Sequence, residues 1–271
     1  MKLKLVPART GLLWVKLGIQ TFWRQPLALG GLFFMFMALM SVASLLPWVG
    51  SALALGLLPA ATLGLMAATK EAEQGKFPMP SVLISGFRAG QQRGRDMLVL
   101  GAVYAVGFLA VMGLSALADG GTFARLYLVG GTMTQEMVLS PDFQTAVWVA
   151  MGLYLPLSLM FWHAPALVHW HGIAPAKSLF FSFVACLRNF WAFTVYALAW
   201  VGVFFVAGLV IMLLSVVLGR TDLMSVIMFP TAMLMAAMFF SSIYFTFRDC
   251  FDATESMPDV SDTSPPKATG V

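Results

Sequence analysis

Three histidines lie close together in the sequence, at His163, His169 and His171. Imidazole nitrogens bind zinc, copper and haem iron, so this group is a candidate ligand set. No second group of His, Cys or acidic residues matches them elsewhere in the sequence, and a haem held between helices would need a ligand from another helix. We expect them to be polar residues at a membrane interface and predict no cofactor; a metal or haem site stays the alternative.

Nineteen methionines raise the same question for copper, above all Met35, Met37, Met233 and Met235. Methionine is a flexible residue that fills irregular gaps between packed helices. We therefore expect these side chains to pack against other helices or face lipid, and copper binding is the alternative.

Three arginines, Arg24, Arg93 and Arg188, each stand near the end of an amphipathic segment and just before a long apolar run. At the level of lipid headgroups, a guanidinium can form a forked pair with a phosphate. The hypothesis is that these arginines contact lipid headgroups or a partner protein. The alternative is that they only anchor the chain on the side of the membrane where basic residues gather.

The apolar runs themselves contain no Asp, Glu, Lys or Arg. Charges inside a membrane are costly and usually mark ion relays or coupling sites. Their absence argues against a transporter coupled through a buried carboxylate and against an intramembrane hydrolase with paired acids. The sequence also lacks a phosphate-binding loop, a dinucleotide fingerprint, a nucleophile elbow and a zinc-protease helix, so we predict that the protein is not an enzyme.

The elements that carry these residues follow from composition. The 271 residues are 60% hydrophobic and 10% charged, with a mean hydropathy of +0.86, whereas soluble domains carry about 25% charged residues. A helix crosses a membrane with about 20 apolar residues. The sequence therefore predicts an all-α, polytopic membrane bundle with six spanning helices, at about residues 27–46, 48–68, 97–117, 143–162, 191–218 and 223–247.

The basic residues indicate the topology of these spans. Six spans place both termini on one side, where fourteen of the sixteen Lys and Arg residues then lie; only Arg125 and Arg220 fall on the other side. The excess predicts that both termini are cytoplasmic. Because every basic residue is accounted for by topology, no basic patch is left over for nucleic acid.

The sequence also contains a possible threefold repeat of one interfacial amphipathic helix followed by two spans. The amphipathic segments begin near Pro7, Pro80 and Pro175, and the second span of each pair contains one interior proline. These interior prolines are Pro59, Pro156 and Pro230. Proline removes a backbone hydrogen bond and can kink a helix, so the kinked helices could line a central cavity; the alternative is that the kinks only improve packing.

Within the first amphipathic segment, Trp and Phe side chains are expected to face the membrane. In the third, Ser178, Ser182, Ala185 and Asn189 form a narrow stripe of small and polar residues. We expect residues 1–250 to form one six-span membrane domain and residues 251–271 to be a disordered cytoplasmic tail, because the tail is rich in acidic residues, Ser, Thr and Pro.

Three stretches carry a resemblance to known proteins: Trp14–Pro26 (WVKLGIQTFWRQP), His163–Val168 and Lys177–Phe190. On these stretches the chain resembles a family of uncharacterised bacterial inner-membrane proteins with six spans. It is also distantly similar to the membrane domain found beside some glycerophosphodiester phosphodiesterases. The resemblance covers most of residues 7–250 and implies a fold and a location in the bacterial inner membrane. It implies no activity, because the chain has no soluble region large enough for the phosphodiesterase domain.

Our functional prediction is a lipid-interacting or accessory module of a membrane complex. Its expected partners are membrane lipids, with other membrane protein subunits as a further option. The alternative is a carrier or permease for a small neutral or amphipathic solute, with its pocket among the three proline-containing spans. An accessory module should have a filled core and an exposed apolar groove, whereas a carrier should have a polar-lined pocket that opens to one face.

Overall fold

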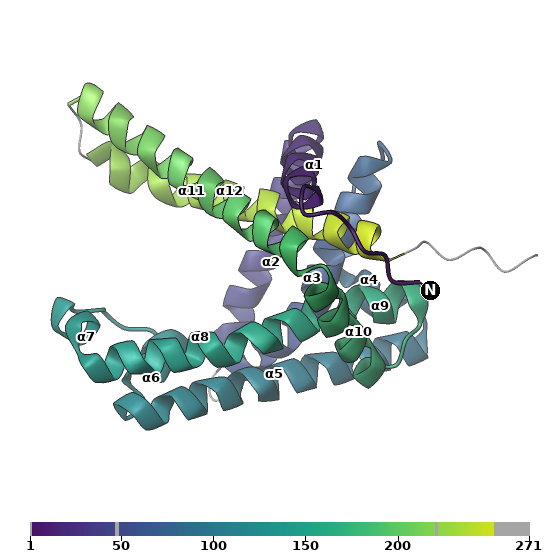
Figure 1. Ribbon diagram of the computed structural model, residues 1–271, viewed down its shortest axis with the longest axis horizontal. Helices are drawn as coiled ribbons and strands as arrows, with labels where there is room; N and C mark the ends of the chain where they lie inside the picture. Colours follow the sequence, from purple (N-terminus) through teal and green to yellow (C-terminus); the bar gives the residue numbers. More distant parts are fainter. Residues whose placement is uncertain (1, 47–48, 220–221, 252–271) are drawn as a thin grey trace, which may run out of the picture.

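The computed structural model describes residues 2–46, 49–219 and 222–251, and this part of the chain is helical (Figure 1). Its elements are α1 (Thr10–Arg24), α2 (Pro26–Ser44), α3 (Gly50–Glu73), the 3-10 helix η1 (Pro80–Ile84), α4 (Ser85–Arg88), α5 (Gln91–Asp119), α6 (Thr122–Val129), α7 (Gln135–Leu139), α8 (Pro141–Phe161), α9 (Ala164–His171), α10 (Pro175–Arg188), α11 (Phe190–Val217) and α12 (Asp222–Cys250). The one extended pairing within the described residues is an isolated antiparallel bridge between Leu3 and Phe251.

Six helical segments of the described chain are long and apolar enough to cross a membrane: α2, α3, α5, α8 together with α9, α11, and residues 226–250 of α12. A spanning helix satisfies its own backbone hydrogen bonds, so long apolar runs fold as helices in lipid. The predicted all-α polytopic bundle is thus confirmed. The predicted start of the second span at residue 48 lies outside the described residues, as do residue 47 and residues 220–221.

The spanning helices form three hairpins, α2–α3, α5–α8 and α11–α12. In Figure 1 the α5–α8 and α11–α12 hairpins diverge toward the left, and α9 and α10 lie at the opposite end of the molecule. We call that opposite end the basic end, because Lys70, Arg93 and Arg248 lie there, on α3, α5 and α12. The helices are therefore gathered at the basic end and separate toward their tips.

The three amphipathic segments, α1, η1 with α4, and α10, repeat one packing relation. The η1–α4 segment packs against α3, and α10 packs against α8. The first segment, α1, packs against α12 and α11, which are the last pair of spanning helices in the sequence. Each amphipathic segment therefore contacts the second spanning helix of the pair that precedes it in cyclic order.

Glycines allow α1 to approach this closely. A Cβ atom on Gly11 would lie 2.3 Å from the carbonyl oxygen of Ala192, and one on Gly18 would lie 2.4 Å from the Cβ of Ser242. Trp14 and Phe22 lie on the same buried face. These two aromatic side chains were expected to face the membrane, and instead they pack inside the protein. The sequence pattern allows both outcomes, because lipid and a helix core are equally apolar.

The polar stripe of α10 also faces the protein. Ser178, Ser182 and Ala185 are buried, together with Cys186, whereas Phe180 and Phe181 are exposed. The Asn189 side chain, directly after α10, accepts a hydrogen bond from the backbone N–H of Val6 and donates to the carbonyl of Lys4. The stripe therefore fixes the N-terminal segment and α8 to α10 through polar contacts.

Three predicted boundaries are corrected by the structure. The second span, predicted to end at about residue 68, continues in α3 as far as Glu73. The third spanning helix begins at Gln91, so Arg93 belongs to its first turn; Gly90, with φ of +101°, separates it from α4. Phe251, expected in the disordered tail, is buried, while residues 252–271 lie outside the described residues.

Candidate functional site

The His163 residue lies at a break between α8 and α9. A helix break frees backbone groups that need other partners in an apolar environment. The Ser182 hydroxyl on α10 supplies both partners, since it donates to the carbonyl of Leu159 and accepts from the backbone N–H of His163, at 2.8 and 2.9 Å. The predicted polar stripe of α10 thereby stabilises the bend that separates α8 from α9.

The ring of His163 is fully buried and is held by Thr246 of α12. The hydroxyl of Thr246 donates to the carbonyl of Ile243 and lies 3.1 Å from both Trp162 Nε1 and His163 Nε2. Because indole N–H is only a donor, the two remaining contacts of this oxygen are best filled by two donors. This assigns the proton of the neutral imidazole to Nε2 and leaves Nδ1 without a partner among the described residues. His163 therefore has a structural role in joining the α8–α9 break to α12.

The other two histidines lie on α9 and do not meet His163 in a ligand set. The side chain of Arg93 donates to the carbonyl of His169, and the ring of His171 contacts that of Phe247 at 5.8 Å between centroids. Among the described residues, no three His, Cys, Asp or Glu side chains are grouped so that they could hold a metal ion.

The three predicted arginines lie at separate places. Arg24 and Arg188 are exposed in the last turns of α1 and α10. Arg93 is exposed at the start of α5 and bonds the end of α9, where carbonyl groups lack helical partners. Within the described residues, no hydrogen bond or ion pair joins any two of them. Arg24 and Arg188 are thus free to face headgroups, whereas Arg93 has a protein partner.

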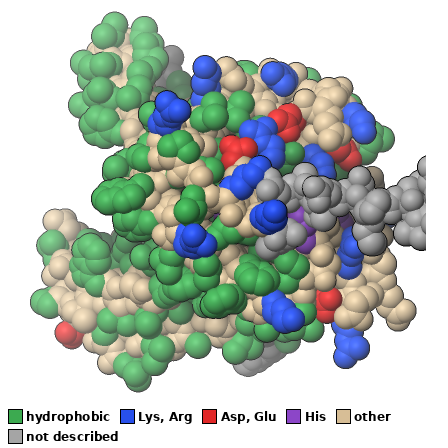
Figure 2. All heavy atoms as spheres, turned by 45° about the vertical axis from the view of Figure 1, so that its right-hand side comes forward, with side chains coloured by type: hydrophobic (Ala, Val, Ile, Leu, Met, Phe, Trp, Pro, Cys, Tyr) green, Lys and Arg blue, Asp and Glu red, His purple; other side chains and the backbone are tan. Residues whose placement is uncertain are grey.

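A different group of charges is concentrated at the basic end. The guanidinium of Arg248 pairs with Glu73 at 2.5 Å and with Asp249 at 2.9 Å, and Asp249 also accepts from Trp14 Nε1. The Lys70 ammonium lies 5.0 Å from the centre of the Trp170 ring. These contacts link α1, α3, α9 and α12. Figure 2 shows Lys and Arg side chains over the body of the molecule and mainly hydrophobic side chains on two lobes that project at the left.

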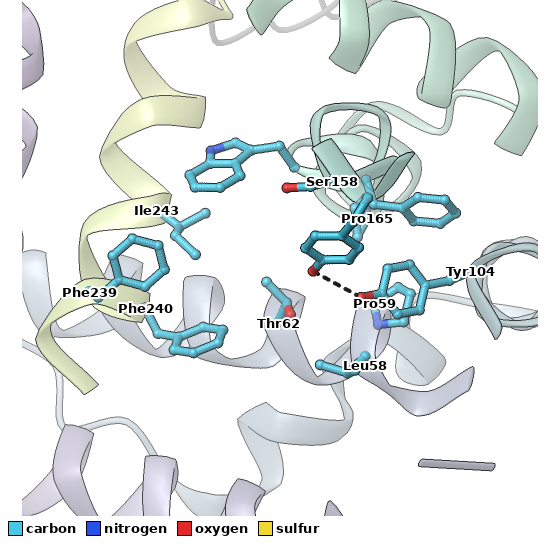
Figure 3. A pocket seen from close by; sticks show the side chains of 12 residues that line it. Leu58, Pro59, Thr62, Tyr104, Ser158, Pro165, Phe239, Phe240 and Ile243 are labelled. Carbon is cyan, nitrogen blue, oxygen red and sulfur yellow. Dashed lines mark hydrogen bonds between the residues drawn. The ribbon is translucent and has the colours of Figure 1, made fainter. Parts of the chain in front are cut away.

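A central cavity of about 170 Å³ lies where the hairpins separate (Figure 3). Its lining comes from α3, α5, α8, α9 and α12 and from the α8–α9 break: Leu58, Pro59, Thr62, Tyr104, Tyr154, Ser158, Phe161, Trp162, Pro165, Phe239, Phe240 and Ile243. Of the three predicted prolines, Pro59 lines the cavity. Pro156 and Pro230 are exposed on α8 and α12 and are not part of the lining, which instead includes Pro165.

An open apolar groove, the second hollow of interest, runs between α1 and α11 and has a volume of about 790 Å³. Its lining is Leu12, Val15, Lys16, Ile19 and Gln20 of α1, and Ala199, Gly202, Val203, Val206 and Ala207 of α11. The α11 residues recur at the spacing of one helical face and are small, so α1 and an outside group can approach that face. We call this hollow the α1–α11 groove.

The charge of Lys16 distinguishes this groove from an ordinary lipid-facing surface. Lys16 and Gln20 are one helical turn apart and both are exposed. In the described part of the chain, Lys16 has no acidic partner. From the sequence, Lys16 is one of the basic residues that indicate topology and lies on the polar side of the first amphipathic segment. Its position beside a groove depends on how α1 crosses α11, which is a long-range contact that local spacing does not reveal.

Comparison with known proteins finds a relative that matches almost the whole chain. A protein of Burkholderia thailandensis described as a "Probable inner membrane protein" is 39% identical over 269 residues, which cover 97% of this chain and 100% of the relative. No family model and no solved structure matches the chain. The distant similarity to the membrane domain beside glycerophosphodiester phosphodiesterases therefore stays a prediction. The chain belongs to a family of multi-pass membrane proteins whose Burkholderia member is a probable inner membrane protein.

Proposed function

We propose that this protein is a non-catalytic, lipid-binding module of the inner membrane that holds an anionic phospholipid in the α1–α11 groove. The observation that carries the proposal is the combination of an apolar groove with a lysine at its side. Leu12, Val15 and Ile19 of α1 and the small residues of α11 would contact an acyl chain. Lys16 would contact the phosphate, and Gln20 would donate a hydrogen bond to it.

The size and charge of the groove support this assignment. Its volume of about 790 Å³ falls within the range of about 300–1,000 Å³ that is common for small-molecule sites. An amphipathic helix at the level of the headgroups places its lysines beside phosphates and its apolar side chains among acyl chains. We further propose that the basic end, with both termini, faces the cytoplasm, as the distribution of Lys and Arg predicts. The lipid would then come from the cytoplasmic leaflet.

The test is native mass spectrometry of protein extracted under mild conditions from its own membrane. We expect a protein that retains one phospholipid, with phosphatidylglycerol preferred over phosphatidylethanolamine. The Lys16→Gln variant should lower retention of phosphatidylglycerol about fivefold, because one lysine near a membrane surface contributes about 1 kcal/mol. Lys177→Gln, which removes an exposed lysine from α10, is the matched control.

A second pair of variants tests the acyl-chain half of the groove. A side chain added at Gly202 would meet no atom within 4 Å of its Cβ, and the same is true at Gly208 on the same helix. Gly202 lines the groove and Gly208 does not. Gly202→Leu should therefore reduce lipid retention while Gly208→Leu leaves it unchanged. Equal retention by both variants, or an added polypeptide in place of lipid, would contradict the proposal.

The alternative function, a carrier for a small neutral solute, is favoured by the central cavity among the three hairpins. It ranks second, because about 170 Å³ is smaller than most ligand pockets and because the lining is mainly apolar. Uptake of a solute into vesicles that contain the purified protein would distinguish a carrier from a binding module.

A further inference from the structure

The central cavity has the size of a single ring. Its volume is about 170 Å³, and an apolar protein cavity of about 150 Å³ holds one benzene molecule. Aromatic side chains form much of the wall: Phe161 and Trp162 come from α8 and the α8–α9 break, and Phe239 and Phe240 come from α12, as Figure 3 shows for the α12 pair. Aromatic rings pack well against another ring, face to edge or offset.

The lining of the cavity carries no charged side chain among the described residues, and this restricts the kind of ligand that it can bind. Among the described residues, no Asp, Glu, Lys or Arg lines the cavity. A charged ligand placed there would lose its hydration without gaining an opposite charge, which is unfavourable. The cavity therefore suits a neutral molecule.

The hydroxyl groups of the lining define what that molecule must offer. Thr69 and Ser241, elsewhere on α3 and α12, donate to the carbonyl four residues earlier. Thr62 and Ser158 have no such bond, and no other hydrogen-bond partner within the described part of the chain. Hydroxyl donors without acceptors are costly in an apolar environment, so both sites favour an oxygen acceptor from outside.

The tyrosine pair adds a third donor. The hydroxyl oxygens of Tyr104 and Tyr154 are 3.3 Å apart, and only one of them can donate to the other. The remaining phenol proton has no acceptor in the described chain. Tyr154 lines the cavity, is 38% exposed, and lies on α8, a segment long and apolar enough to cross a membrane. A ligand could therefore enter sideways from lipid.

We propose that the central cavity binds a neutral six-membered ring that carries oxygen acceptors and enters from the bilayer. Thr62, Ser158 and the tyrosine pair donate to its oxygens, and the α12 aromatics cover its face. Two sources offer this chemistry: the ring of a membrane quinone with an isoprenoid tail, and a free phenol. The site is separate from the α1–α11 groove, so neither proposal depends on the other.

The test is photolabelling of the full-length protein in nanodiscs made with its native lipids. The probe is a phenyl diazirine with a hydroxymethyl group, and its controls carry a methyl group or a carboxylate instead. The hydroxymethyl probe should label residues 239–243 saturably, and the double variant Thr62→Val, Ser158→Ala should lower this labelling about fivefold or more. Thr62→Ser, which keeps a hydroxyl, should label normally.

Two matched controls separate binding from folding. Thr194→Val removes a hydroxyl that already bonds the carbonyl of Phe190 and lies outside the cavity, so its labelling should equal that of the unchanged protein. The melting temperature of the double variant shows whether its fold is retained. If the fold is lost, the single variant Ser158→Ala, with an expected loss of about fivefold, replaces it.

Competition then identifies the source of the ring. Protection by a short-chain ubiquinone at lower concentration than phenol, with a prenylated quinone in the extract of the native protein, assigns the site to a membrane quinone. Protection by phenol alone assigns it to a free solute. Both outcomes support the proposal. Cavity labelling that is the same for the methyl and hydroxymethyl probes, or that neither competitor reduces, would overturn it.

Discussion

The two ends of the molecule are stabilised in different ways. At the basic end, polar side chains from distant parts of the chain meet in buried or half-buried positions: Trp14 bonds Asp249, Asn189 bonds the N-terminal segment, and Thr246 bonds His163. At the hairpin tips, large apolar side chains are exposed; Leu117 is 83% and Val217 is 80% exposed. The protein itself therefore supplies the packing at the basic end, and the bilayer must supply it at the tips.

This difference explains why the hairpins diverge. Each spanning helix satisfies its own backbone, so a tip needs no partner inside lipid. Helices in a membrane are held together by close packing and polar contacts and not by the hydrophobic effect. Those contacts are concentrated at the basic end, which therefore sets the angles between the hairpins. The α1–α11 groove and the central cavity both follow from these angles.

The largest expected effect comes from a change that separates α1 from the basic end. A side chain at Gly18 would overlap the backbone of Ser242, and flexible rearrangement cannot relieve a clash with backbone. We expect Gly18→Leu to lower the free energy of unfolding by about 3 kcal/mol. Unfolding by SDS in mixed micelles, followed by tryptophan fluorescence, measures this change.

The matched change at a tip should have almost no effect. Gly208 lies on the exposed part of α11, and an added Cβ meets no atom within 4 Å. Gly208→Leu should therefore change the free energy of unfolding by less than about 0.5 kcal/mol. If both substitutions destabilise the protein equally, the contrast between the two ends is wrong.

The next effect concerns the junction between the α8–α9 break and α12. Thr246→Val removes the acceptor of both Trp162 Nε1 and His163 Nε2. Each buried donor that loses its partner costs about 1–3 kcal/mol, so we expect a loss of about 2 kcal/mol or more in the free energy of unfolding. Thr246→Ser keeps the hydroxyl and should recover most of the loss. A Ser variant as unstable as the Val variant would show that the methyl group matters and the hydrogen bonds do not.

The same contrast explains how much the sequence could predict. Long charge-free runs predicted the six spans, because the length of an apolar run is a local property. The stripe of Ser178, Ser182 and Ala185 predicted an amphipathic helix, but not that its polar side would face α8. In lipid the usual rule is ambiguous, since apolar residues suit both the core and the membrane. Only the contact of Ser182 with the break at His163 decides the orientation.

The two hollows lay beyond sequence reasoning for a related reason. The sequence allowed Pro59, Pro156 and Pro230 either to line a cavity or only to improve packing. Of the three, Pro59 lines the central cavity, together with Tyr104 from a different span. Lys16 borders the groove only because Gly11 and Gly18 bring α1 against α11 and α12. Such positions depend on crossing angles between helices that are far apart in the sequence. Small residues at close contacts were the signal that could have indicated them.

Thiols at the basic end should be inaccessible to a labelling reagent, whereas a thiol introduced at a hairpin tip should be accessible. Cys186 and Cys250 are free and buried, and burial raises the pKa of the Cys186 thiol above its ordinary value of 9.0. We expect neither thiol to react with a maleimide in the folded protein at pH 7–9. A cysteine introduced at exposed Thr132, in the loop between α6 and α7, should react at once. Mass spectrometry of the intact protein counts the modified thiols.

This substitution also tests the proposed orientation. With an impermeant maleimide on spheroplasts, Thr132→Cys should be modified if the basic end faces the cytoplasm, and protected if the orientation is reversed.

The raised pKa of Cys186 should make the stability of the fold depend on pH. Above pH 9 the unfolded chain releases a proton that the folded chain keeps, so stability should decrease as the pH rises, and Cys186→Ala should reduce that decrease.

A small effect is also expected where charged side chains of the basic end meet solvent. The side chains of Arg248 and Glu73 are 36% and 29% exposed, and an ion pair at such a position is screened by water and salt. Glu73→Gln should therefore cost less than about 1 kcal/mol of unfolding free energy, and this cost should shrink as the salt concentration rises. Glu71→Gln, two residues earlier on α3, is the control. A loss as large as that of Thr246→Val would mean that charge pairing, and not the buried neutral bonds of Thr246 and Ser182, holds the helices together at this end.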